Sequence, residues 1–180
     1  MHGFYDNFQS ILKSIGLCME KKHILPALML TYSAIDIVGG LERKKGEGTK
    51  ASFIRFVDGY LLRAKPLGCT ALELFGARCG ILHAAAAESD LFKKGKVRMV
   101  IYAWGKGDVE KIRKSTERLE RYDIVAVHVS DLVEAFRDGL ANYLDKVYED
   151  EDRIKLVEMN AEKIFSLMPT SIVDEFLELE

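Results

Sequence analysis

Two side chains in this sequence, Arg78 and His83, are suited to chemistry and lie five positions apart. A histidine can give or take a proton near neutral pH, and a guanidinium group binds anionic oxygens in pairs. Both residues lie in the mostly apolar stretch 72–83, which runs into the alanines of 84–87. An unpaired buried cation is very costly, so we expect Arg78 to meet a carboxylate, a second subunit or a ligand.

The spacing of these two residues is not that of a tight pair on one helix face. Five positions correspond to roughly 140° of rotation, because a helix turns about 100° per residue. We therefore expect Arg78 and His83 to meet only if His83 lies at a frayed helix end, or if two copies of the helix meet in a symmetric dimer. Gly76 and Gly80 lie four positions apart and would let another helix come close.

Apolar residues recur at three- and four-residue spacings before this stretch and predict the helices that must position it. The predicted segments are a helix over 4–22, a helix after His23 that stops at Gly39-Gly40, an exposed loop over 42–50, and a helix over 52–62. The second helix is apolar nearly all round, which is typical of the most buried helix in a fold. It carries Asp36, a carboxylate that needs a partner when buried, and Tyr32, one turn away on the same face.

Thr70 and Glu73 match a capping box at the start of the helix that carries Arg78. The pattern then changes, because two segments rich in β-formers flank a charged helix and predict a small βαβ unit. The predicted segments after Arg78 are strands over 97–104 and 122–129, the intervening helix over 108–121, and helices over 131–148 and 152–168. The sequence therefore predicts a single domain over 1–180. It is mainly α, a helical bundle with a two-stranded βαβ appendage at about 96–129 and two C-terminal helices.

The composition restricts the setting of the protein. A net charge of −2 gives no global case for nucleic-acid binding, so an RNA site would have to be a local basic patch. Three cysteines with no paired spacing indicate reduced thiols rather than a disulfide framework or a metal site. We expect no cofactor, because no complete nucleotide-binding motif is present. The start of the chain does not match a signal peptide, and no stretch approaches the roughly 20 apolar residues of a membrane span. We expect a cytoplasmic protein with no membrane partner.

The segment Arg78-Cys79-Gly80-Ile81-Leu82-His83 resembles the Arg-x4-6-His signature of HEPN (higher eukaryotes and prokaryotes nucleotide-binding) domains. The resemblance covers roughly residues 4–88 at the level of helix order, and the βαβ segment has no counterpart in it. It implies a helical bundle. Many members of the family are metal-independent endoribonucleases of toxin–antitoxin and antiphage systems. In those members the arginine and histidine of two protomers form a composite site, so the resemblance implies a homodimer, an RNA substrate and an antitoxin or other protein partner.

By this resemblance Arg78 and His83 are the candidate catalytic residues. RNA cleavage without a metal moves one proton from the 2′-hydroxyl and another to the leaving 5′-oxygen, and histidine can do either. The charge that grows on the phosphate requires a cation, which Arg78 would supply. If the second helix packs against the helix of Arg78, either Asp36 or Tyr32 would hold the guanidinium in orientation.

Basic residues near this segment are candidates for an RNA-facing rim. They are Lys93, Lys94, Lys96 and Arg98, together with Arg43, Lys44, Lys45 and Lys50. Each run taken separately also fits an ordinary solvated face.

Two other functions remain open. The chain could be a non-catalytic HEPN-like module that binds a nucleotide or a protein through the same groove. It could also be a structural or interaction protein in which Arg78 only joins helices through an ion pair with Asp36 or Glu73. In that case His83 would be an ordinary helix-end histidine.

Overall fold

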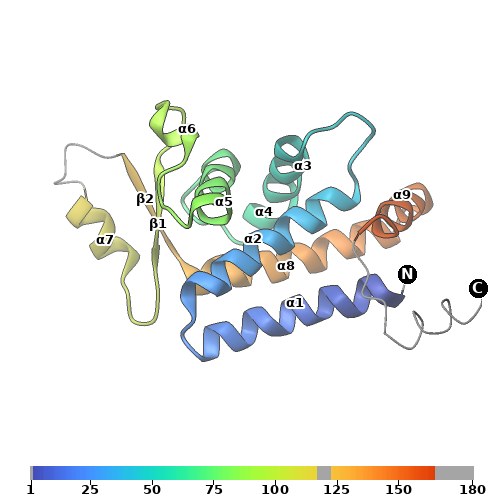
Figure 1. Cartoon of the computed structure of the whole chain (residues 1–180), viewed down its shortest axis with the longest axis horizontal. Helices are drawn as coiled ribbons and strands as arrows, with labels where there is room; N and C mark the ends of the chain where they lie inside the picture. Colours follow the sequence, from blue (N-terminus) through green and yellow to red (C-terminus); the bar gives the residue numbers. More distant parts are fainter. Residues whose placement is uncertain (1, 117–122, 165–180) are drawn as a thin grey trace, which may run out of the picture.

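The structure is a computed structural model that describes residues 2–116 and 123–164. It is mainly helical with one small parallel sheet, which confirms the predicted fold class (Figure 1). The described elements are α1 (His2–Glu20), α2 (Ile24–Leu41), α3 (Thr49–Phe56), the π-helix η1 (Val57–Leu61), α4 (Leu62–Ala64), α5 (Ala71–Ala84), α6 (Asp90–Lys93), β1 (Met99–Ala103), α7 (Val109–Thr116), β2 (Ile124–His128), α8 (Val129–Tyr148) and α9 (Glu151–Ala161). Parts of two predicted helices, 117–121 and 165–168, lie outside the described residues.

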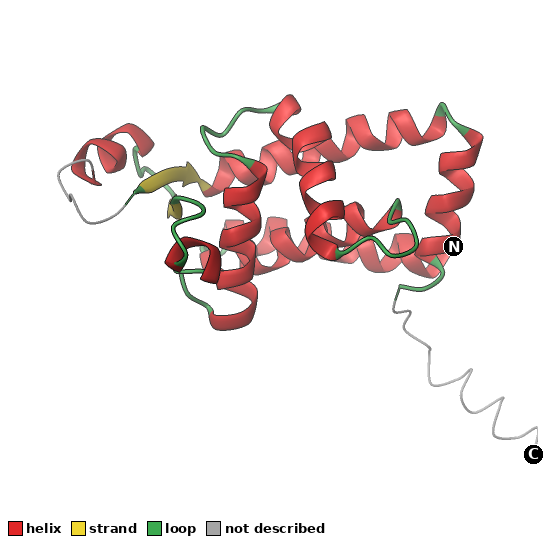
Figure 2. Ribbon diagram, turned by 90° about the horizontal axis from the view of Figure 1, so that it is seen from above, coloured by secondary structure: helices red, strands yellow, loops and turns green. Residues whose placement is uncertain are grey.

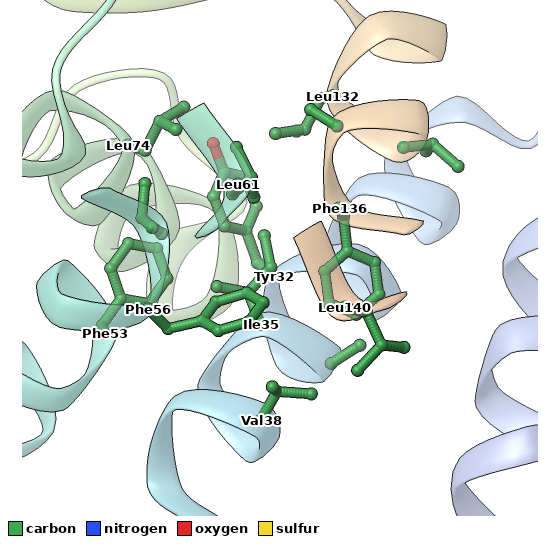
Figure 3. Close-up of a cluster of buried hydrophobic side chains, with 14 of the residues drawn as sticks. Tyr32, Ile35, Val38, Phe53, Phe56, Leu61, Leu74, Leu132, Phe136 and Leu140 are labelled. Carbon is green, nitrogen blue, oxygen red and sulfur yellow. The ribbon is translucent and has the colours of Figure 1, made fainter. Parts of the chain in front are cut away.

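Helix α2 is the centre of the fold and contacts α1, α3, α5, α8 and α9. Figure 3 shows its Tyr32, Ile35 and Val38 among the aromatic and aliphatic side chains of α3 and α8. By length and hydropathy α2 alone among the described helices could cross a membrane, although half of it is buried inside the protein. Its central position accounts for the apolar composition, because a helix that is surrounded by others needs apolar residues on every side.

The prediction that Gly39 and Gly40 end this helix is wrong. Helix α2 continues to Leu41, and Gly39 serves close packing instead. A Cβ atom at Gly39 would lie 2.9 Å from the backbone oxygen of Ser52, so the absence of a side chain lets α2 and α3 approach each other. Among the described residues, a Cβ atom at Gly40 would meet only the guanidinium of Arg43, at 3.5 Å.

The helix predicted over 52–62 begins earlier, at Thr49, and changes geometry along its length. After Phe56 it becomes the π-helix η1, which packs against α8. The contact is close because Gly139 of α8 has no side chain: a Cβ atom there would lie 2.8 Å from Cα of Leu61.

Helix α5 begins as predicted, with the capping box of Thr70 and Glu73. It ends where Ala85 adopts a left-handed conformation, with φ 48°. The close approach expected at Gly76 and Gly80 is made by the chain segment that follows the helix rather than by another long helix. A Cβ atom at Gly80 would lie 2.5 Å from the backbone oxygen of Ala86.

The two predicted strands form the βαβ unit. Strands β1 and β2 are parallel, with Met99 opposite Ile124 and Ala103 opposite His128. Helix α7 packs against β2, and β1 packs against α5. Figure 2 shows the sheet and α7 at one end of the helical bundle. Two strands alone are marginally stable, so the contact with α5 supports the sheet and ties it to the helix that carries Arg78.

Candidate functional site

Arg78 extends from α5 to Asp36 on α2, and this ion pair is the base of the candidate site. Its Nε and Nη2 atoms donate to Oδ2 of Asp36 at 2.6 and 2.5 Å. The side chains are only 16% and 15% exposed. The ring of Phe75, one turn earlier on α5, lies 5.9 Å from the guanidinium carbon of Arg78. Of the two carboxylates that the sequence offers for Arg78, the fold selects Asp36.

His83 joins this pair within a single chain. Its Nε2 atom lies 3.1 Å from Nη1 of Arg78. His83 is the last but one residue of α5 and is exposed. The helix end is not frayed at His83, which keeps helical geometry, so the pair forms by neither of the two expected routes. The long arginine side chain spans the angle between the two positions instead. No second copy of the chain is required to bring the two groups together.

The hydrogen-bond chemistry fixes the state of the imidazole in this arrangement. Arginine has only N–H donors and no acceptor, so Nε2 of His83 must accept the hydrogen bond from Arg78. The ring is then neutral, with its proton on Nδ1. The structure therefore presents His83 as a base whose lone pair points at the guanidinium.

Burial and pairing act in opposite directions on the two charged groups. Burial raises the pKa of Asp36, and the hydrogen bond and charge of Arg78 oppose this rise without cancelling it. Burial also disfavours the charged form of Arg78, but the hydrogen bonds that Arg78 donates to Asp36 and the negative charge of Asp36, with a smaller contribution from Cys79, together outweigh it, so the pKa of Arg78 is raised. The guanidinium thus stays charged and directed at Asp36, while Nη1 is left for His83 and, at 3.9 Å, for the sulfur of Cys79.

Tyr32 does not take the orienting role that the sequence suggested for it. Its hydroxyl is fully buried and shares a hydrogen bond with the hydroxyl of Tyr102 on β1. Burial raises the pKa of both phenols. Tyr32 therefore connects α2 to the sheet, and the orienting role is left to Asp36.

Arg98, a candidate for RNA contact, is engaged in an internal ion pair. Its Nε and Nη2 atoms donate to the carboxylate of Glu73 at 2.6 and 3.0 Å. Glu73 also accepts from the backbone N–H of Thr70. The buried carboxylate of Glu73 therefore caps α5 and also holds Arg98, the residue just before β1.

Lys93, Lys94 and Lys96 are exposed and lie on or just after α6. This segment covers the side of α5 that carries Gly76, whose nearest neighbours are Ser89 and Val97. Arg78 is two positions from Gly76, which corresponds to roughly 200° around the helix. The lysine run therefore lies on another side of α5 from the Arg78–His83 pair.

The basic residues after α2 lie nearer to the pair. Arg43, Lys44 and Lys45 line a cavity of about 620 Å³ that also has Asp36 in its wall. Arg43 is close enough to help lower the pKa of Asp36 against the effect of burial. Asn160 and Lys163, from α9 and the residues after it, complete the cavity, and no local signal in the sequence identified them. Within residues 2–116 and 123–164, no group of three or more histidine, cysteine or carboxylate side chains is placed to hold a metal ion.

Comparisons with protein-family models, curated proteins and solved structures find no match to this chain.

Proposed function

We propose that this protein is a HEPN-like, metal-independent endoribonuclease of the cytoplasm that acts as a homodimer. The observation that carries the proposal is the contact between Nη1 of Arg78 and Nε2 of His83, at 3.1 Å, beside a carboxylate that fixes the guanidinium. It places a neutral imidazole and an oriented cation at one exposed helix end, which is what cleavage of a phosphodiester requires.

In the proposed reaction the substrate phosphate takes the place of His83 at the outer face of Arg78. Nε2 of His83 accepts the proton of the 2′-hydroxyl, and the 2′-oxygen then attacks phosphorus. The bond from phosphorus to the 5′-oxygen breaks, and a 2′,3′-cyclic phosphate remains. Arg78 stabilises the charge on the non-bridging oxygens, and Asp36 keeps the guanidinium in place. The leaving 5′-oxygen takes its proton from the corresponding histidine of a second copy, which enters this step in its protonated, imidazolium form. The need for one neutral and one protonated histidine is the reason for proposing a dimer.

An RNA-cleaving protein of this kind would need control inside the cell. A protein partner that covers the exposed end of α5 would block access to His83. We include such an antitoxin-like partner in the proposal, since His83 is accessible in the chain alone.

One observation favours a second candidate function. Nε and Nη2 of Arg78 both bind Asp36, so a single nitrogen of the guanidinium faces outward to His83. This arrangement can hold one anionic oxygen without cleaving a bond. A non-catalytic module that binds a nucleotide or a protein carboxylate would use the same pair.

The test is cleavage of several RNAs by the purified protein in EDTA, beside Arg78→Lys and His83→Ala. Arg78→Lys keeps a positive charge but cannot bind Asp36 and a phosphate oxygen at the same time. His23→Ala is the matched control, because His23 is exposed and lies at another helix junction. We expect cleavage with cyclic phosphate ends by the native protein and by His23→Ala, and loss of cleavage in the other two variants.

Cleavage that survives in His83→Ala would show that the nuclease activity does not belong to this pair. No cleavage by a folded, dimeric native protein would favour the binding module.

A further inference from the structure

A cationic cavity adjoins the Arg78 site and has no role in the reaction described above. It lies between α2, the loop that follows α2, and α9. Its volume of about 620 Å³ lies within the range of roughly 300–1,000 Å³ that is usual for binding pockets. Its lining includes Asp36, Ile37, Arg43, Lys44, Lys45 and Lys163.

The charged groups around this cavity are almost all positive. Arg43, Lys44, Lys45 and Lys163 contribute cations. Asp36, the only carboxylate in the lining within the described part of the chain, is already bound by Arg78. Among the described residues, none of these four cations lies within ion-pair distance of a carboxylate. Among the other basic residues that the sequence singled out, Arg98 differs in this respect, since it is paired with Glu73.

The loop that carries the cations is held in position by side-chain hydrogen bonds. The amide nitrogen of Asn160 on α9 donates to the backbone oxygens of Leu41 and Arg43, at 2.9 and 3.2 Å. Nε of Arg43 donates to Oγ of Ser52 on α3, at 3.2 Å. These bonds join the start of the loop to two helices, so the positive charge stands at a defined place beside α2.

Asp36 connects this cavity to the catalytic pair. One side of its carboxylate binds Arg78, and the same residue forms part of the cavity wall. A strand whose phosphate lies at Arg78 would therefore place its neighbouring phosphates near Arg43, Lys44 and Lys45. Ile37 and Met159 supply apolar surface in the same lining, against which a base can lie while the cations hold the backbone.

We propose that this cavity binds the sugar-phosphate backbone of a single RNA strand next to the phosphate held at Arg78 and His83. This inference rests on the proposed ribonuclease function and names the surface that holds its substrate. The flanking strand follows the loop after α2 and the face of α9, and it does not follow the lysine run of α6.

The test measures binding separately from cleavage. A fluorescent, unstructured RNA oligonucleotide is titrated with the His83→Ala protein, in which the strand stays intact, at several salt concentrations. Lys44→Ala/Lys45→Ala in the His83→Ala background should weaken RNA binding roughly tenfold at low salt. The plot of the log of the association constant against the log of the salt concentration should also become less steep, by about 1.4, because each phosphate contact on a single strand contributes about 0.7 to the slope. Both lysines are exposed, so the variant should fold, and circular dichroism checks this.

Lys93→Ala/Lys94→Ala is the matched control, with the same change in net charge at exposed positions on the other side of α5. It should leave affinity and salt slope unchanged. Equal losses in both variants would overturn the proposal, since they would show only a general effect of charge, and so would an absence of RNA binding by the His83→Ala protein. If the native protein binds RNA through Lys44 and Lys45 but does not cut it, the ribonuclease function is wrong and the cavity assignment stands.

Discussion

Arg78 directs two nitrogen atoms, Nε and Nη2, at one oxygen of Asp36, and the other carboxylate oxygen, Oδ1, is buried with no hydrogen-bond partner among the described residues. The ion pair joins α5 to α2, which are 42 positions apart at these residues. Because it is nearly buried, each partner depends on the other for compensation of its charge. The pair can therefore stabilise the fold and orient the guanidinium at the same time.

Removal of one member of this pair should destabilise the protein strongly. We expect Arg78→Met and Asp36→Leu each to lower the free energy of unfolding by about 3–5 kcal/mol, because each leaves an uncompensated buried charge. The double variant Arg78→Met/Asp36→Leu should be more stable than either single variant, since neither charge remains. Urea unfolding measures all three. Additive losses in the double variant would show that the two residues are not coupled.

Asp36→Asn tests whether the carboxylate also positions Arg78 for the proposed reaction. A misplaced guanidinium should lower kcat for RNA cleavage by about a hundredfold, with a smaller effect on KM because other cations still bind the strand. Asp58→Asn on η1 is the matched control, since Asp58 is exposed and lies outside the site. Cleavage by Asp36→Asn at the native rate would mean that Asp36 has no positioning role.

The hydrogen bond between Tyr32 and Tyr102 gives a second coupled pair. Tyr102→Phe should cost about 1–3 kcal/mol in unfolding free energy, because it leaves the fully buried hydroxyl of Tyr32 without its partner. Tyr32→Phe/Tyr102→Phe removes both hydroxyls and should recover most of this loss. Thermal or urea unfolding gives the comparison. A double variant less stable than Tyr102→Phe would contradict the coupling.

Glu73 should make the free energy of unfolding depend on pH in the acidic range. Burial acts to raise its pKa, but hydrogen bonds from Arg98 and from the backbone of Thr70 outweigh this, so the pKa of Glu73 is lowered in the folded state. The stabilisation that ionised Glu73 gives the folded state is therefore fully present above the pKa of about 4.3 that the group has in the unfolded chain. It is lost as the pH falls through the lower pKa that Glu73 has in the folded state.

The variant that isolates this effect is Glu73→Gln. We expect it to be about 1–3 kcal/mol less stable than the native protein at pH 7, and the difference should shrink as the pH falls below about 4. Glu20→Gln is the control, since Glu20 is 68% exposed and pairs with its neighbour on the chain, Lys21. A native–variant difference that stays constant from pH 7 to pH 3 would rule out this role of the carboxylate.

Two adjacent glycines of α2 should respond in opposite ways to alanine. Gly39→Ala would place a Cβ atom 2.9 Å from the backbone oxygen of Ser52 and should cost about 1–3 kcal/mol through overpacking. The Cβ atom of Gly40→Ala would contact the flexible side chain of Arg43, and the substitution should stabilise the protein by up to about 1 kcal/mol through helix propensity. Unfolding of the two variants side by side measures this, and a loss at Gly40 as large as that at Gly39 would contradict the packing argument.

The sequence by itself determined the features that depend on near neighbours along the chain. Helical periodicity, the capping box of Thr70 and Glu73, and the two β-rich segments were predicted and are confirmed. These features follow from the spacing of side chains within a few residues, where helix and strand geometry are fixed. The need for Arg78 to have a partner was also clear from the apolar residues around it.

Only the tertiary structure decided which partner each charged group took. Asp36 and Glu73 were both candidates for Arg78, and the fold gave Asp36 to Arg78 and Glu73 to Arg98. In the same way it turned Tyr32 toward β1 and used Gly39 for helix contact rather than helix termination. The physical reason is that these contacts join segments far apart in the chain. Their pairing depends on how the helices are positioned in three dimensions, and the local pattern of the sequence does not specify it.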